Sequence, residues 1–126
     1  MRHFRAYLIL ICAAAVLLLA SCGKRYTAKG LVKDYVKAYA VNPDKIDITS
    51  FSDLDSTKVI SDSLLQVMRE TAQKDALFKP DILFTAERKD PTLLFIRMRF
   101  QLPDDTLEQS RTFYFDRDLT GIIAFK

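Results

Sequence analysis

The sequence predicts an α+β protein in which two helices pack on an antiparallel sheet of four to five strands. Two segments repeat apolar residues at helical spacing, whereas the second half of the chain contains short segments in which apolar and polar residues alternate. The connections between these later segments are too short to hold a crossover helix. Consecutive strands are therefore expected to run antiparallel, as a meander.

The first helix is predicted over residues 28–41, where apolar residues recur three and four positions apart until Pro43 stops the pattern. A second helix is predicted over residues 61–75. Ser61 supplies a hydroxyl cap and Asp62 an early acid, and the apolar residues that follow have helical spacing.

Strands are predicted at 45–51 with a resumption at 57–60, and then at 82–88, 93–102, 110–116 and 122–125. The segment 93–102 has the clearest alternation. Its core face would hold Leu94, Ile96, Met98, Phe100 and Leu102, and its other face Phe95, Arg97, Arg99 and Gln101. With both helices on one face of the sheet, the face that carries the arginines would meet solvent or a partner.

This order of elements over residues 28–126 resembles the cystatin-like and NTF2-like folds of small exported proteins. The resemblance implies that the sheet is curved. It also implies two alternative functions: some NTF2-like proteins catalyse reactions with an Asp or Glu in a pocket, and a curved sheet can enclose an apolar ligand.

Residues 1–21 have the organisation of an export signal, with Arg2, His3 and Arg5 ahead of an uncharged run at 6–20. That run is shorter than the roughly 20 residues that span a bilayer as a helix. Immediately after it, Leu19-Ala20-Ser21-Cys22 resembles the lipobox of bacterial lipoproteins. The alternatives are an ordinary secretory signal and an uncleaved anchor.

The lipobox resemblance implies that Cys22 receives a diacylglycerol, that the chain is cut before it, and that the freed amine is acylated. Residues 22–29 are then expected to form a lipidated tether and residues 30–126 a single domain. Cys22 is followed by neither the Asp typical of inner-membrane retention nor an acidic cluster typical of surface export. This resembles outer-membrane lipoproteins that face the periplasm, with surface exposure as the alternative.

Without residues 1–21, 17 Lys and Arg remain against 16 Asp and Glu, and this near-neutral balance argues against a nucleic-acid partner. His3 and Cys12 are lost with the signal, which leaves no His and no Cys other than Cys22. Ser-His-Asp and Cys-His catalysis and the usual zinc sites are therefore excluded. We predict no catalytic residue, cofactor or metal site.

Two acidic motifs are better explained as turns. Residues 113–121 resemble the D-x-D-x-T motif of haloacid-dehalogenase-type phosphatases, but only five residues follow Gly121, where that family needs a long α/β domain. An EF-hand starting at Asp116 would also need an acid beyond residue 126. Asp53 and Asp55 likewise lack the Gly and Glu of a calcium loop. We therefore predict a hairpin turn after Asp116 and a solvated turn around Asp53.

Three tripeptides, at 55–57, 62–64 and 105–107, resemble the O-glycosylation acceptor of exported Bacteroidota proteins. They make Ser56, Ser63 and Thr106 candidate modification sites, with a turn or a helix start as the alternative explanation.

Together these observations predict a non-enzymatic, lipid-anchored cell-envelope protein. It would contact the membrane through the lipid on Cys22 and bind an unknown envelope protein or glycan. The candidate interaction face is Phe95, Arg97, Arg99 and Gln101, because arginine and aromatic residues are enriched at binding hot spots. The alternative is that these arginines pair with acids on neighbouring strands.

Overall fold

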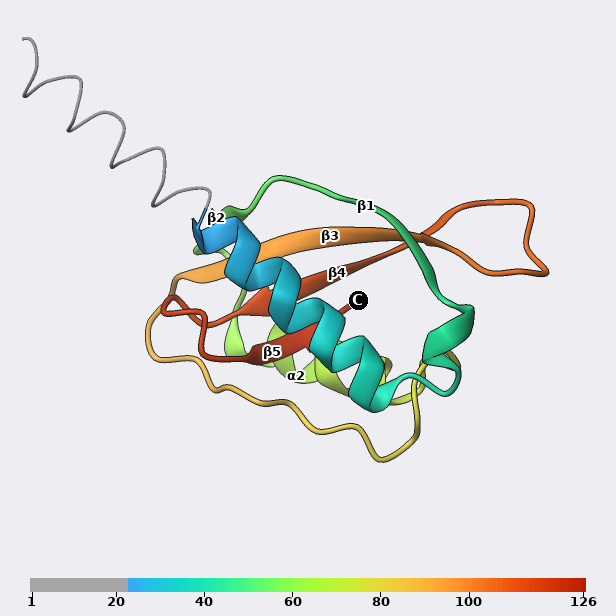
Figure 1. The fold of residues 1–126 in the computed structure, drawn as a ribbon. Coiled ribbons are helices and arrows are strands. Elements are labelled where there is room, and N and C mark those ends of the chain that lie inside the picture. The colour runs from blue at the N-terminus through green and yellow to red at the C-terminus, as the bar shows by residue number, and fades with distance from the viewer. Residues whose placement is uncertain (1–22) are drawn as a thin grey trace, which may run out of the picture.

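The computed structural model describes residues 23–126 (Figure 1). A helix covers residues 23–39. It is followed by the 3-10 turn η1 (Pro43–Lys45), β1 (Asp47–Phe51), β2 (Asp55–Thr57), α2 (Asp62–Gln73), β3 (Leu93–Gln101), β4 (Gln109–Phe115) and β5 (Ile122–Phe125). The predicted α+β class is confirmed. The predicted signal peptide and Cys22 lie outside the described residues.

All five strands pair antiparallel, in the order β1-β3-β4-β5. β2 also pairs with β3, next to β1 along the same edge: Phe51 lies opposite Met98 and Asp55 opposite Phe95. The last three strands form the predicted meander. β3 is therefore the centre of the sheet.

The alternation predicted for β3 is confirmed. Ile96, Met98 and Phe100 are fully buried, whereas Arg97 and Arg99 are exposed. This alternation places one face of the sheet against the N-terminal helix (residues 23–39), whose apolar residues share a core with β3 and β4. Figure 1 shows this helix lying across the sheet.

Residues 23–29, which lie within the tether predicted over 22–29, are helical and continue directly into the rest of the N-terminal helix. Ala28 is fully buried one turn before Val32, so the apolar stripe begins earlier than the sequence pattern suggested. Arg25 donates hydrogen bonds to the carbonyls of Phe51 (3.0 Å) and Ser52 (3.1 Å), which join this first part of the helix to the end of β1. Within residues 23–126, no helix combines the length and apolar character needed to cross a membrane.

α2 begins as predicted, with Ser61 Oγ accepting a hydrogen bond from the Leu64 N–H at 3.1 Å. Its position differs from the expectation that both helices cover one face. Leu65 and Met68 pack in a second cluster with Tyr114 and Ala124, on the face opposite the N-terminal helix. Figure 1 shows α2 on the far side of β5.

The physical reason for this arrangement is that the last three residues of β4 and all of β5 are apolar, so this part of the sheet is apolar on both faces. Phe113, Tyr114 and Phe115 are all buried, as are the four residues of β5. Phe113 and Phe115 point into the larger core and Tyr114 into the smaller one. Both faces of this edge of the sheet must therefore be covered, and each helix covers one of them.

Residues 82–88 were predicted to form a strand, and this prediction is wrong. The segment runs beside β5, but only Thr85 and Ala86 donate backbone hydrogen bonds to it, both to the Ile122 carbonyl. In return the Ile122 N–H donates to the Thr85 hydroxyl at 2.8 Å rather than to a carbonyl. A Cβ on Gly121 would lie 2.6 Å from that hydroxyl, so this close approach requires glycine.

We predict that Met98→Asp lowers the free energy of unfolding by several kcal/mol, because it places an unpaired charge in the core. Arg99→Asp, one residue along β3, should change it by less than about 1 kcal/mol. Thermal melts of the two variants test this difference. Equal losses would contradict the register of β3.

Candidate functional site: the open face of β3 and β4

The predicted interaction face lies on the side of the sheet opposite the N-terminal helix. Arg97 and Arg99 are exposed there, and Phe95 is half-buried. Gln101 differs from the other three because its side-chain amide donates to the Asp105 carbonyl in the β3–β4 connection. The structure thus brings Phe95, Arg97 and Arg99 together and holds Gln101 in the turn.

These three residues line an open hollow of about 370 Å³. Phe95 and Tyr114 form an aromatic pair with ring centroids 5.7 Å apart, and Lys126 Nζ lies 6.0 Å from the Tyr114 ring centroid. The remaining lining residues come from β4 and from the end of β1 to the start of β2: Thr112, Ser52, Asp53 and Asp55.

Most of these neighbours are not among the residues that the sequence predicted for this face. Tyr114 and Thr112 lie opposite Phe95 and Arg97 on β4, so they could have been found once the strand register was known. Lys126 and the two aspartates reach the hollow through the tertiary fold. No local pattern in the sequence indicates them.

The two arginines lack partners within the described chain. Among residues 23–126, neither guanidinium forms an ion pair or a hydrogen bond. The reason is their register: Arg97 lies opposite Thr112 and Arg99 opposite Ser110, which are both neutral. The alternative that these arginines pair with acids on the adjacent strands is therefore wrong.

The arrangement can bind anions. Arg97 and Arg99 are two positions apart on one strand, which separates their Cα atoms by about 7 Å. Each guanidinium can donate two parallel hydrogen bonds to a carboxylate or phosphate. Asp53 and Asp55 carry opposite charge at the β2 side, so an anionic group fits best over the arginines and Lys126. Among residues 23–126, no group of three or more His, Cys, Asp or Glu is placed to hold a metal ion.

A larger hollow, of about 540 Å³, lies between α2 and residues 87–91, and the two arginines that line it form ion pairs. Among residues 23–126, Arg88 Nε and Nη2 are buried without a hydrogen-bond partner. Arg69 pairs with Glu87 at 3.2 Å and Arg88 with Asp62 at 3.1 Å. Arg69 also donates to the Ile123 carbonyl at 2.8 Å. These contacts tie α2 and the 82–89 segment to β5, which is a structural role.

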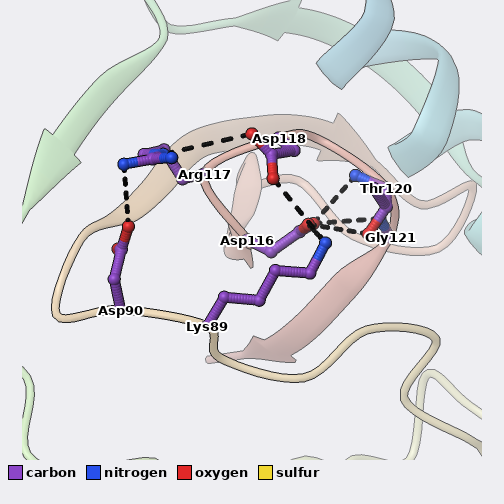
Figure 2. A network of polar contacts seen from close by, with 7 residues as sticks. All are labelled: Lys89, Asp90, Asp116, Arg117, Asp118, Thr120 and Gly121. Atoms are coloured by element: carbon purple, nitrogen blue, oxygen red, sulfur yellow. Dashed lines mark hydrogen bonds and ion pairs between the residues drawn. The ribbon is translucent and has the colours of Figure 1, made fainter.

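The D-x-D-x-T motif forms the predicted turn between β4 and β5 (Figure 2). The buried Asp116 carboxylate accepts hydrogen bonds from the Thr120 N–H (2.8 Å), the Thr120 hydroxyl (2.7 Å) and the Gly121 N–H (3.2 Å). Leu119 adopts a φ of 54°, in the left-handed region that such a tight turn requires.

Charged residues around this turn are paired as well. Lys89 Nζ lies 3.9 Å from Asp116 and 3.6 Å from Asp118, and Arg117 pairs with Asp90 at 3.0 Å (Figure 2). Burial alone would raise the pKa of Asp116. The hydrogen bonds from Thr120 and Gly121, with the attraction of Lys89, outweigh burial and lower that pKa below its usual value. Asp116 is therefore an ionised structural acceptor.

The candidate glycosylation residues occupy separate, exposed places. Ser56 lies in β2, Ser63 in the first turn of α2 and Thr106 in the β3–β4 connection. All three hydroxyl-bearing side chains are accessible, so modification at these positions stays a prediction.

We predict that Asp116→Ala lowers the free energy of unfolding by about 2–4 kcal/mol, because two backbone N–H groups and a hydroxyl lose their acceptor. Asp118→Ala is the control. Its side chain is 55% exposed, so its loss should cost less than about 1 kcal/mol. Chemical denaturation of both variants measures the difference, and equal effects would contradict the structural role of Asp116.

The lowered pKa of Asp116 also predicts a pH dependence. Because the folded pKa lies below the unfolded value of about 3.9, the stabilisation is fully present above that value. It is lost as the pH falls through the folded pKa. Asp116→Asn does not titrate, so it should lose less stability than the wild type between about pH 5 and pH 2. Parallel stability curves for the two proteins would contradict this assignment.

Comparison of the chain with protein-family models, curated proteins and solved structures found no match.

Proposed function

We propose that this protein is a lipid-anchored binding module of the cell envelope, which recognises an anionic group on an envelope protein or glycan through the open face of β3 and β4. The observation that carries the proposal is the pair of exposed guanidiniums, Arg97 and Arg99, without partners in the described chain. The lipobox at Cys22 supports the anchor, with the outer membrane facing the periplasm as the expected location.

The neighbours of the two arginines favour recognition over simple solvation. The rings of Phe95 and Tyr114 provide an apolar floor at one end of the hollow, and Lys126 adds a third cation. A bidentate ion pair at the edge of such a floor is partly shielded from water, which strengthens it relative to an ion pair in bulk solvent. Arginine and aromatic residues together are the typical composition of a binding hot spot.

The alternative that the protein is an enzyme has less support than the binding proposal. A carboxylate-based mechanism would be supported by a pocket with two close carboxyls, one of which has a raised pKa. The pKa of the buried Asp116 carboxyl is lowered, which is the opposite of what such a mechanism needs. Its oxygens are already bound by Thr120 and Gly121.

The apolar-ligand alternative also lacks support from the packing. On the face covered by the N-terminal helix, aromatic side chains fill the space over the sheet. The ring centroids of Phe78 and Phe125 are 4.6 Å apart, and those of Phe113 and Phe125 are 5.4 Å apart. Contacts of this kind are typical of a packed core.

The anchor is tested by Cys22→Ser. Because the variant cannot receive the lipid, we expect it in the soluble fraction, whereas the wild type should fractionate with membranes. Washing with high salt removes purely electrostatic association before the comparison. A variant that still fractionates with membranes after the wash would contradict the lipid anchor.

The binding face is tested by crosslinking in intact envelopes with the double variant Arg97→Glu/Arg99→Glu. It should fold and be exported normally but lose the crosslinked partner, because two attractive charges become repulsive. Lys58→Glu/Lys74→Glu is the matched control, since it makes the same charge change at two exposed residues that flank α2. Recovery of the partner at wild-type yield with the Arg97→Glu/Arg99→Glu variant would contradict the proposal.

A further inference from the structure

Charge is divided unevenly between the N-terminal helix and the rest of the domain. Residues 23–39 contain five basic residues and one acid, whereas residues 40–126 contain 12 basic residues and 15 acids. The helix is therefore a cationic element on a domain whose remainder is net negative. The opposite net charges of the two parts nearly cancel, so the net charge of residues 23–126 is close to zero.

The basic residues of the helix form a stripe. Arg25, Lys29, Lys33 and Lys37 are each four positions apart, so they follow one another along one side of the helix. The stripe begins beside β1, where the Nζ atoms of Lys29 and Lys33 lie 5.6 Å and 5.9 Å from the centroid of the Phe51 ring. Among residues 23–126, none of these four cations forms an ion pair.

An exposed aromatic residue lies on the same side. Tyr26 is 78% exposed and precedes Lys33 and Lys37 by seven and eleven positions, which places all three on one face. Gly30 lies between them, and a Cβ at that position would meet nothing within 4 Å, so the surface here is open. A tyrosine among lysines combines an apolar ring and a polar tip with long flexible cations.

We propose that this basic face of the N-terminal helix, formed by Tyr26, Lys29, Lys33 and Lys37, lies against an anionic membrane surface. The inference rests on the proposed lipid anchor, because Cys22 directly precedes the helix and would hold its first turn at the headgroups. An anionic leaflet attracts basic residues within a Debye length of its surface, and Tyr26 fits the boundary between headgroups and acyl chains.

This contact would orient the whole domain. The N-terminal helix packs on one face of the sheet, with Ile96 and Phe113, whereas Arg97 and Arg99 are on the other. A membrane under the helix therefore leaves the proposed binding face directed away from the lipid. The lipid on Cys22 supplies attachment, and the helix supplies orientation.

The absence of tryptophan from the chain provides the test. Tyr26→Trp introduces a single fluorescent reporter on the exposed helix face. The full-length protein is reconstituted into vesicles of phosphatidylcholine, or of phosphatidylcholine with about 30% phosphatidylglycerol, which supplies the anionic surface. Both preparations contain brominated phosphatidylcholine as quencher. We expect stronger quenching of Trp fluorescence with phosphatidylglycerol, and loss of this difference at 1 M salt, where the screening length is about 3 Å.

Charge-reversal variants in the same background identify the surface. Lys33→Glu/Lys37→Glu should lose the extra quenching that phosphatidylglycerol causes, whereas the matched control Lys58→Glu/Lys74→Glu should keep it. Equal quenching of the parent in the two kinds of vesicle would overturn the inference, as would an equal loss in both charge variants.

The proposal of a lipid anchor and the proposal of a contact between the helix and the membrane can be contradicted independently of each other. If the wild type and Cys22→Ser float equally with phosphatidylcholine vesicles, the anchor proposal is wrong. The helix inference depends only on whether Trp quenching requires phosphatidylglycerol, however the chain is held at the vesicle.

Discussion

The pairing of β3 with three other strands is the constraint on which most of the structure depends. β1 and β2 share one edge of β3, and β4 occupies the other. Because side chains alternate along a strand, this pairing places Met98 in the core and Arg97 and Arg99 on the open face. A slip of one residue would exchange these faces, so the packing of the core and the position of the exposed arginines have the same cause.

β5 lies at the edge of the sheet, and no further strand pairs with its outer side. Other parts of the fold cover this edge instead. Residues 82–89 lie along it without a regular ladder. The Thr85 hydroxyl of this segment and the Arg69 guanidinium of α2 bind the backbone of β5 instead. These side chains satisfy backbone groups that would otherwise be free to pair with another chain. The close contact of Gly121 with Thr85 holds the segment in place, and the Asp116 turn positions that glycine.

The two basic surfaces lie on opposite sides of the sheet. The stripe of the N-terminal helix lies on the side of the larger core and adjoins Cys22 in sequence. Arg97 and Arg99 lie on the opposite side, next to a hollow with an aromatic floor. In the proposals made above, the stripe next to Cys22 would meet an extended anionic plane, whereas Arg97 and Arg99 would meet a single anionic group.

The sequence by itself determined the features that repeat over short distances: the alternation of β3, the Ser61 cap of α2 and the turn at Asp116, because each depends on residues a few positions apart. The tertiary structure alone decided which face α2 covers, why 82–88 is not a strand and why the arginines are unpaired. These features depend on contacts between distant segments, such as Thr85 with Ile122, and on the neutral residues that the register places opposite Arg97 and Arg99. Such pairings leave no local periodicity in a single sequence.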